Sequence, residues 1–109
     1  MTIPIIRSRA FEQDLDAFVG YFLDQHAYHA ARDFGAAVDA TLAFIAEFPD
    51  LGESRSNIRR SWGDLRVLPT KDFPRHLIWF VRSAHRIDVV RLLHGSRRVH
   101  ASDFPESSK

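Results

Sequence analysis

The chain of 109 residues contains no cysteine, which excludes a disulfide-stapled scaffold, a zinc site with cysteine ligands and a cysteine nucleophile. A reducing compartment fits this composition, so we expect a cytoplasmic protein. No apolar run approaches the roughly 20 residues that a membrane-spanning helix needs. The first residues lack the charged and apolar regions of a secretory signal, and we expect none.

Lysine is also scarce: thirteen of the fifteen basic residues are arginine, and only Lys71 and Lys109 are lysine. Arginine suits the recognition of phosphate and carboxylate, although a GC-rich genome produces the same bias. The net charge of +1 conceals an uneven distribution. Residues 1–54 carry nine acidic and three basic side chains, whereas residues 55–109 carry twelve basic and five acidic ones.

The length predicts one domain over residues 1–109, because a chain of this size buries roughly two-thirds of its unfolded surface. It is too short for both a large cofactor site and a substrate domain, and we expect no cofactor. The sequence contains no internal repeat and no low-complexity tract.

The first half predicts a strand and two helices. Ile3 to Ile6 is a short apolar run interrupted by Pro4, which is typical of an edge strand. Apolar residues at helical spacing then predict a helix over about 9–25, with Ser8 as its N-cap, and a second helix over about 28–48 that Pro49 and Gly52 end. Two such helices form an antiparallel hairpin most simply.

The second half predicts strands after a connection over residues 49–61. Three runs have strand composition: Trp62 to Leu68, Arg75 to Val81 and Arg86 to His94. Short connections that contain residues 69–72 and 82–85 separate them. The three runs form an antiparallel meander whose middle strand is central. From about residue 99 a polar and poorly defined tail follows, with Phe104 as its one large apolar anchor. The sequence thus predicts an α+β domain of order β-α-α-β-β-β, a helical hairpin packed on a small antiparallel sheet whose other face carries the basic residues.

Several catalytic motifs are absent. The sequence has no glycine-rich phosphate loop, no zincin helix and no glycine-flanked nucleophilic serine. His26 and His29 have a spacing of three but lie at the helix junction without a third ligand, so we expect no metal.

The segment from Arg91 to Arg98 is the sharpest chemical feature. Arg91 interrupts an apolar strand, so it either pairs with a carboxylate such as Asp16 or Asp39 or faces a partner. His94, at the strand end, either caps the strand or titrates near neutrality. With Arg66 these residues would form a cationic surface for a phosphodiester, and exposure favours partner contacts for Arg97 and Arg98.

Five segments together resemble the ParE toxins of the ParE/RelE superfamily of type II toxin–antitoxin systems. They are residues 11–15 (FEQDL), 48–52 (FPDLG), 65–66 (LR), 76–80 (HLIWF) and 90–97 (VRLLHGSR). The last is the most specific, and the resemblance covers about residues 3–98. It implies a RelE/ParE-like fold.

The resemblance also implies a function. ParE-like toxins are cytoplasmic, are neutralised by a ParD-like antitoxin whose C-terminal segment folds across them, and inhibit DNA gyrase, whereas RelE-like relatives cleave messenger RNA in the ribosome. We expect target contacts from Arg66, Arg91, His94, Arg97 and Arg98, without requiring direct contact with nucleic acid. Exposed apolar residues on the helices would bind the antitoxin, namely Tyr21, Phe22 and Tyr28, although core packing is the stronger alternative for Phe22.

The lysine cluster of the RelE-like nucleases does not carry over to this chain. Residues 55–61 contain three arginines and no lysine, and no tyrosine follows Arg98. Arginine is a poor general base because it stays protonated. We therefore favour a growth-arresting toxin that inhibits gyrase by binding and is not an enzyme. The alternatives are a ribosome-dependent endoribonuclease using Arg66, Arg91 and His94, or an inactive module that only binds its antitoxin.

Overall fold

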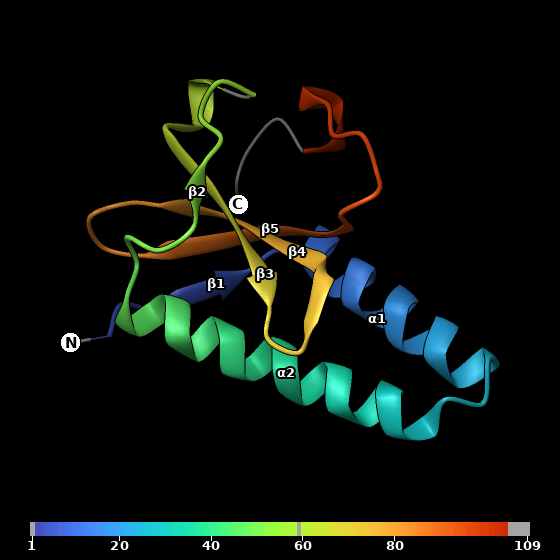
Figure 1. The fold of residues 1–109 in the computed structure, drawn as a ribbon. Helices are drawn as coiled ribbons and strands as arrows, with labels where there is room; N and C mark the ends of the chain where they lie inside the picture. The colour runs from blue at the N-terminus through green and yellow to red at the C-terminus, as the bar shows by residue number, and fades with distance from the viewer. Residues whose placement is uncertain (1, 59, 105–109) are drawn as a thin grey trace.

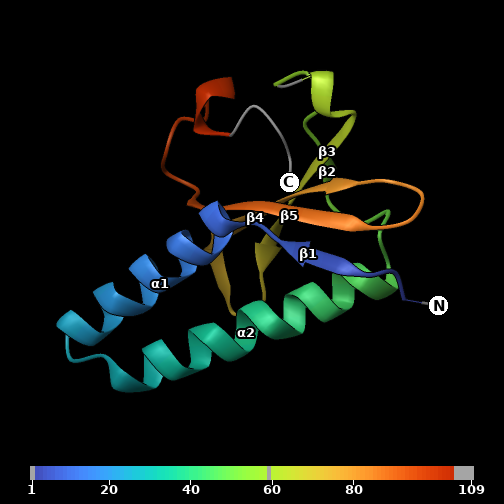
Figure 2. The ribbon, with the colours of Figure 1, turned by 180° about the vertical axis from the view of Figure 1, so that it is seen from behind.

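A computed structural model gives the structure of the protein and describes residues 2–58 and 60–104. Two helices precede most of the sheet, and Figures 1 and 2 show them together on one of its sides. The elements in chain order are β1 (Ile5–Arg7), α1 (Arg9–Asp24), α2 (Tyr28–Glu47), β2 (Glu53–Ser54), the 3-10 turn η1 (Arg60–Trp62), β3 (Asp64–Thr70), β4 (Phe73–Arg82), β5 (Ile87–His94) and the 3-10 turn η2 (Ala101–Asp103). The predicted α+β class is confirmed.

Helix α1 begins at the predicted N-cap. The backbone N–H of Phe11 donates to Ser8 Oγ at 3.1 Å, and the Ser8 hydroxyl donates to the carbonyl of Val90 at 3.0 Å. The cap satisfies a free N–H of the first turn and ties the helix to β5. The helix ends just before His26, whose positive φ of 58° reverses the chain into α2. Both helices agree with their predicted bounds to within one residue.

The five strands form one mixed sheet in the order β1-β5-β4-β3-β2. The predicted antiparallel meander of β3, β4 and β5 is confirmed, and β4 is central. The predicted edge strand β1 pairs parallel with β5, with Ile5 opposite Ile87. The sheet is therefore not wholly antiparallel. A connection as long as the helical hairpin imposes no antiparallel partner on β1, unlike a tight turn.

Two details at the edge of the sheet differ from the prediction. Strand β2, only two residues long, pairs with Arg66 and Val67 and is too short to show an alternating pattern. The turn from β3 to β4 consists of Lys71 and Asp72 alone, because Pro69 and Thr70 belong to β3. Proline has no backbone N–H to donate to a strand ladder. Pro69 is tolerated there because β2 pairs only with Arg66 and Val67, so no ladder hydrogen bond is lost on that edge.

Apolar clusters cover both faces of the sheet. The helix side holds the main core, whose fully buried side chains include Phe11, Phe34, Val38, Ile45, Ile78, Phe80, Ile87, Val89 and Leu92. The other face holds a second cluster of Leu65, Val67, Trp79, Val81, Val90, Leu93 and Phe104. Figure 2 shows η1 and η2 on this second side. No described helix is long and apolar enough to cross a membrane.

The second cluster corrects one expectation and confirms another. Alternation along the three central strands places apolar side chains on the face away from the helices, so the prediction that this face carries the basic residues was wrong. The expected anchor of the tail is confirmed, since Phe104 is 4% exposed and packs between Trp62 and Trp79 with ring centroids 5.4 Å from each. The remainder of the predicted tail, residues 105–109, lies outside the described residues.

Candidate functional site

A groove of about 430 Å³ runs between α1 and the sheet. Helix α1 contributes Ala17, Phe18, Tyr21 and Phe22, and the strands contribute His76 and His94. The groove thus brings together two residues expected to bind the antitoxin, Tyr21 and Phe22, and one expected to bind the target. Tyr21 is 59% exposed at its rim. Phe22 is half-buried and also packs against the main core, so both of its expected roles are compatible with its position.

Two imidazole rings meet in this groove. His76 on β4 stands opposite His94 on β5, and their ring centroids lie 5.2 Å apart at an interplanar angle of 85°. The other rings close to His76 are all phenylalanine: Phe18 at 4.8 Å, Phe34 at 4.9 Å, Phe22 at 6.1 Å and Phe73 at 6.2 Å. Burial, and secondarily His94, lower the pKa of His76, so this ring is neutral at pH 7.

The sequence identified His94 but did not place His76 among the expected site residues. The two rings lie 18 positions apart in the chain, and only the register between β4 and β5 sets them opposite each other. A sequence pattern could have found the pair only after that register was fixed.

The turn after β5 holds the ring of His94. His94 Nδ1 lies 2.7 Å from Ser96 Oγ and accepts a hydrogen bond from the backbone N–H of Ser96 at 3.1 Å. The intervening Gly95 donates its N–H to the carbonyl of Arg75 at 2.6 Å. A Cβ at Gly95 would lie only 3.3 Å from that oxygen, so the glycine permits this close approach.

Arg91 lies beside α1 and is engaged within the fold. Its guanidinium donates to both carboxylate oxygens of Asp14, from Nε at 2.7 Å and from Nη2 at 2.9 Å, and its Nη1 also donates to the carbonyl of Asp103. Asp14 accepts a further bond from the backbone N–H of Leu92 at 2.9 Å. The hydrogen bonds to Asp14 raise the pKa of Arg91 despite its partial burial. The expected carboxylate partner therefore exists, but it is Asp14 rather than Asp16 or Asp39.

Arg66 lies elsewhere and is also engaged. On β3 it stands opposite Phe80, which belongs to the helix-side core, whereas Arg91 stands opposite Trp79, which belongs to the cluster on the other face. The Arg66 guanidinium donates to Asp64 at 3.0 Å and to the carbonyl of Asp50 at 2.6 Å. The structure does not join Arg66 and Arg91 into one cationic surface.

The last two expected arginines differ from each other. Arg97 pairs with Asp103, whose pKa is lowered chiefly by a backbone hydrogen bond from His100 and also by Arg97. Arg98 is exposed, and no described carboxylate lies within ion-pair distance of it; the same holds for the exposed Arg75. The hydrogen bond from the Gly95 N–H to the Arg75 carbonyl joins the start of β4 to the turn after β5, and this turn leads to Arg98. Two exposed cations without a described carboxylate partner therefore lie near the turn after β5.

Tyr28 lies outside the groove, at the junction of α1 and α2. It is 60% exposed, and its ring faces that of His26 at 5.9 Å. Figures 1 and 2 show this junction projecting beyond the strands. Tyr28 is therefore an exposed aromatic side chain that does not line the groove. Within the described part of the chain no three histidine or acidic side chains gather as metal ligands, His26 and His29 included.

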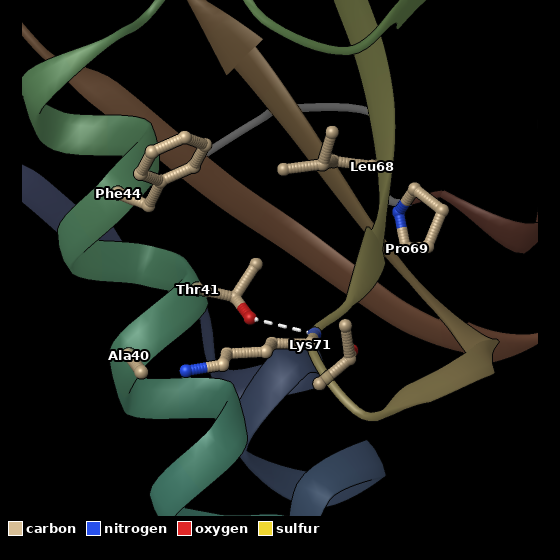
Figure 3. Close-up of a pocket in the computed structure, with 7 residues that line it drawn as sticks. Ala40, Thr41, Phe44, Leu68, Pro69 and Lys71 are labelled. Carbon is tan, nitrogen blue, oxygen red and sulfur yellow. Dashed lines mark hydrogen bonds between the residues drawn. The ribbon is translucent and has the colours of Figure 1, made fainter.

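A second groove, of about 620 Å³, lies between α2 and the end of β3 (Figure 3). Its lining is mostly apolar: Ala40, Thr41, Phe44, Leu68, Pro69, Thr70 and Lys71. Thr41 Oγ1 accepts the backbone N–H of Lys71 at 3.0 Å and donates to the carbonyl of Ala37 at 2.8 Å, so it attaches the β3–β4 turn to the helix. The sequence did not single out this groove, since it forms only where the open end of β3 meets α2.

The family now follows from comparison with known proteins. The model of the ParE toxin of type II toxin–antitoxin systems, parDE, matches residues 5–99, so the chain belongs to the ParE toxin family. A curated relative, the toxin ParE1 of Caulobacter vibrioides, is 28% identical over 98 residues, which cover 90% of this chain and 95% of that protein. The protein is therefore a ParE-family toxin of a type II toxin–antitoxin system, and the match confirms the family expected from the five segments.

Proposed function

We propose that this toxin arrests growth in the cytoplasm by binding DNA gyrase, without a cofactor or catalysis of its own, and that a ParD-like antitoxin neutralises it. Family membership supports a toxin with a cognate antitoxin. The choice of gyrase rests on the chemistry that the described side chains leave available.

The observation that carries the proposal is the engagement of both arginines on which a nuclease would depend. Arg91 is held by Asp14 and by the carbonyl of Asp103, and Arg66 is held by Asp64 and by the carbonyl of Asp50. A phosphodiester would have to displace these partners, and breaking a partly buried ion pair is costly because it leaves the carboxylate without its guanidinium. The arrangement favours inhibition by binding over cleavage of RNA.

The antitoxin contact belongs to the α1 groove in this proposal. An amphipathic segment can place apolar side chains against Tyr21 and Phe22 and acidic side chains near Arg75 and Arg98, since helix-in-groove docking uses such anchors. Tyr28 would add a separate contact at the hairpin tip. His94, Arg97 and Arg98 remain the proposed target contacts, with Arg66 and Arg91 acting through the fold.

Purified toxin tests the proposal directly. We expect it to inhibit gyrase supercoiling at micromolar concentration and expect added antitoxin to restore the activity. A translation extract measured in parallel should keep its messenger RNA intact. Arrested translation with cleaved messenger and unaffected gyrase would instead establish the endoribonuclease, and antitoxin binding without either effect would establish an inactive module.

A further inference from the structure

The second groove, between α2 and the end of β3 (the α2 groove), adjoins an exposed apolar face of the helix. Ala40, Phe44 and Phe48 follow one another at intervals of four residues, so they lie along one side of α2 and its C-cap. Phe44 is 50% exposed and Phe48 47% exposed, and their ring centroids lie 5.1 Å apart. We propose that a second copy of this chain covers this face, with the two α2 helices antiparallel and Phe48 of each copy in the α2 groove of the other.

The edge of β3 beside the α2 groove offers no hydrogen-bond donor to an added strand. The carbonyl of Leu65 accepts a backbone hydrogen bond at 2.7 Å from the segment after β2, so the backbone groups of Leu65 point away from β4. By alternation those of Pro69 point the same way, and proline has no N–H. The N–H of Lys71 is already bound to Thr41 Oγ1. An occupant that binds through its side chains, such as a helix, therefore fits this groove better than a strand.

An antiparallel pair of α2 helices is self-complementary on this face. When the two-fold axis passes beside Phe44, Ala40 lies one helical turn to one side of the axis and Phe48 one turn to the other side. The small side chain of Ala40 therefore comes opposite the partner's Phe48. The α2 groove beside Ala40 is mostly apolar and has a volume of about 620 Å³, which accommodates a phenylalanine ring (Figure 3). Because the arrangement is symmetric, the same contact forms twice.

Two charged side chains near this face lack a partner within their own chain. Lys71 and Glu47 are both exposed, and no described residue of opposite charge lies within ion-pair distance of either. Figure 3 shows the Lys71 side chain extending toward Ala40. In the antiparallel pair the partner's Glu47 stands at the level of Thr41, next to Ala40. Each copy thus supplies the carboxylate that the lysine of the other copy lacks.

The face on α2 is separate from the α1 groove. None of the residues that line the α1 groove belongs to α2, so a dimer and the proposed antitoxin contact at Tyr21 and Phe22 use different residues. Dimerisation is thus independent of the proposed function. The apolar contact consists chiefly of two phenylalanine rings from each copy, which is small for a permanent dimer. We expect a reversible dimer with a dissociation constant on the order of micromolar.

Sedimentation velocity of the purified toxin between about 1 and 200 µM tests the proposal. The wild type should change from monomer to dimer over this range. Phe44→Asp places two carboxylates beside the two-fold axis and should keep the toxin monomeric at every concentration. Leu23→Asp is the matched control, because Leu23 is 46% exposed on α1 and lines neither groove, and it should dimerise as the wild type does. Circular dichroism verifies that each variant is folded.

Exchange of the two charges tests the antiparallel arrangement itself. Lys71→Glu and Glu47→Lys should each weaken the dimer by roughly fivefold or more, because like charges then meet twice. The double variant should regain the wild-type dissociation constant, since the pair re-forms with its charges reversed. These exposed positions decide the question even if Phe44→Asp fails to fold.

Three results would overturn the proposal. The first is a wild type that stays monomeric at every concentration, and the face would then belong to a different protein if Phe44→Asp weakened antitoxin binding or gyrase inhibition. The second is a dimer that Phe44→Asp leaves intact, because such a dimer uses another surface. The third is a double charge variant that associates no more tightly than the single variants do.

Discussion

Arg91 shows how a single residue changes its meaning between sequence and structure. Because it is an arginine within an apolar strand, the sequence predicts either a contact with a partner or an ion pair within the fold. The structure pairs it with Asp14, 77 residues away, and with the carbonyl of Asp103. One side chain thus joins α1, β5 and the C-terminal segment.

Replacement of Arg91 by alanine should therefore destabilise the fold before it affects any target. The variant leaves the carboxylate of Asp14, whose side chain is only 15% exposed, without its guanidinium partner. A hydrogen bond to a charged group contributes about 1.5–3 kcal/mol to the stability of a fold. We expect the free energy of unfolding in urea to fall by about 2–3 kcal/mol.

Arg98→Ala is the matched control for that measurement. Arg98 is exposed and has no described carboxylate partner, so the substitution should change the stability by less than about 0.5 kcal/mol. If Arg91→Ala were as stable as Arg98→Ala and yet lost toxicity, Arg91 would be a target contact and the structural interpretation would be wrong.

At the scale of elements, the C-terminal segment acts as a cover for the second face of the sheet. Phe104 packs between Trp62 and Trp79, while Asp103 binds Arg97 and the backbone N–H of His100. Phe104, packed on Trp79 of β4, and the hydrogen bond from Arg91 of β5 to the carbonyl of Asp103 therefore hold η2 against β4 and β5, while the Asp103 carboxylate braces the segment itself. The main core on the helix side does not depend on this contact.

Phe104→Ala should loosen this cover without unfolding the domain. Burial of a phenylalanine side chain contributes about 1.5–3 kcal/mol, and the segment can lift away rather than leave a cavity. We expect a loss of about 2 kcal/mol in stability and a red shift of tryptophan fluorescence as water reaches Trp62 and Trp79. Phe48→Ala, at a half-exposed position outside the second cluster, should leave the emission unchanged. An unshifted spectrum for Phe104→Ala would show that other contacts hold the segment.

For the whole molecule, the uneven charge of the sequence is largely neutralised by local pairing. The two helices carry seven acidic and two basic residues, as the first half of the sequence indicated. Most described arginines of the second half nevertheless lie within ion-pair distance of a carboxylate: Arg55, Arg66, Arg82, Arg86, Arg91 and Arg97. Arg75 and Arg98 are among the exposed cations that have no described carboxylate partner, and both lie near the turn after β5, so they are available for steering a partner.

The double variant Arg75→Glu/Arg98→Glu should slow association with an acidic antitoxin. We expect stopped-flow rates about tenfold lower at low ionic strength and a difference that largely disappears at 0.5 M salt, because screening shortens the range of the interaction. The double variant Arg9→Glu/Arg32→Glu makes the same change in net charge on the helices. An equal slowing in that control would mean that net charge, and not the position of these two cations, governs the encounter.

The sequence by itself determined the helices, the meander, the edge strand and the family. Helical and alternating periodicities are local patterns, and each of the five family segments is contiguous in the chain. Ser8 and Pro49 lie within one helical turn of the helix ends that they predict. Strand β2 escaped because two residues carry no period. The α1 groove was only half foreseen, since Tyr21, Phe22 and His94 were selected separately and for different partners.

Tertiary structure alone decided which of these residues meet. The parallel pairing of β1 with β5, the register that sets His76 against His94 and the pairing of Arg91 with Asp14 all join segments that no local pattern relates. The same is true of the apolar second face, where alternation buries the strands' remaining apolar residues under Phe104. Contacts between distant segments depend on how a whole sheet packs. The excess of arginine over lysine in the sequence therefore could not show which of the described arginines pair with carboxylates within the fold.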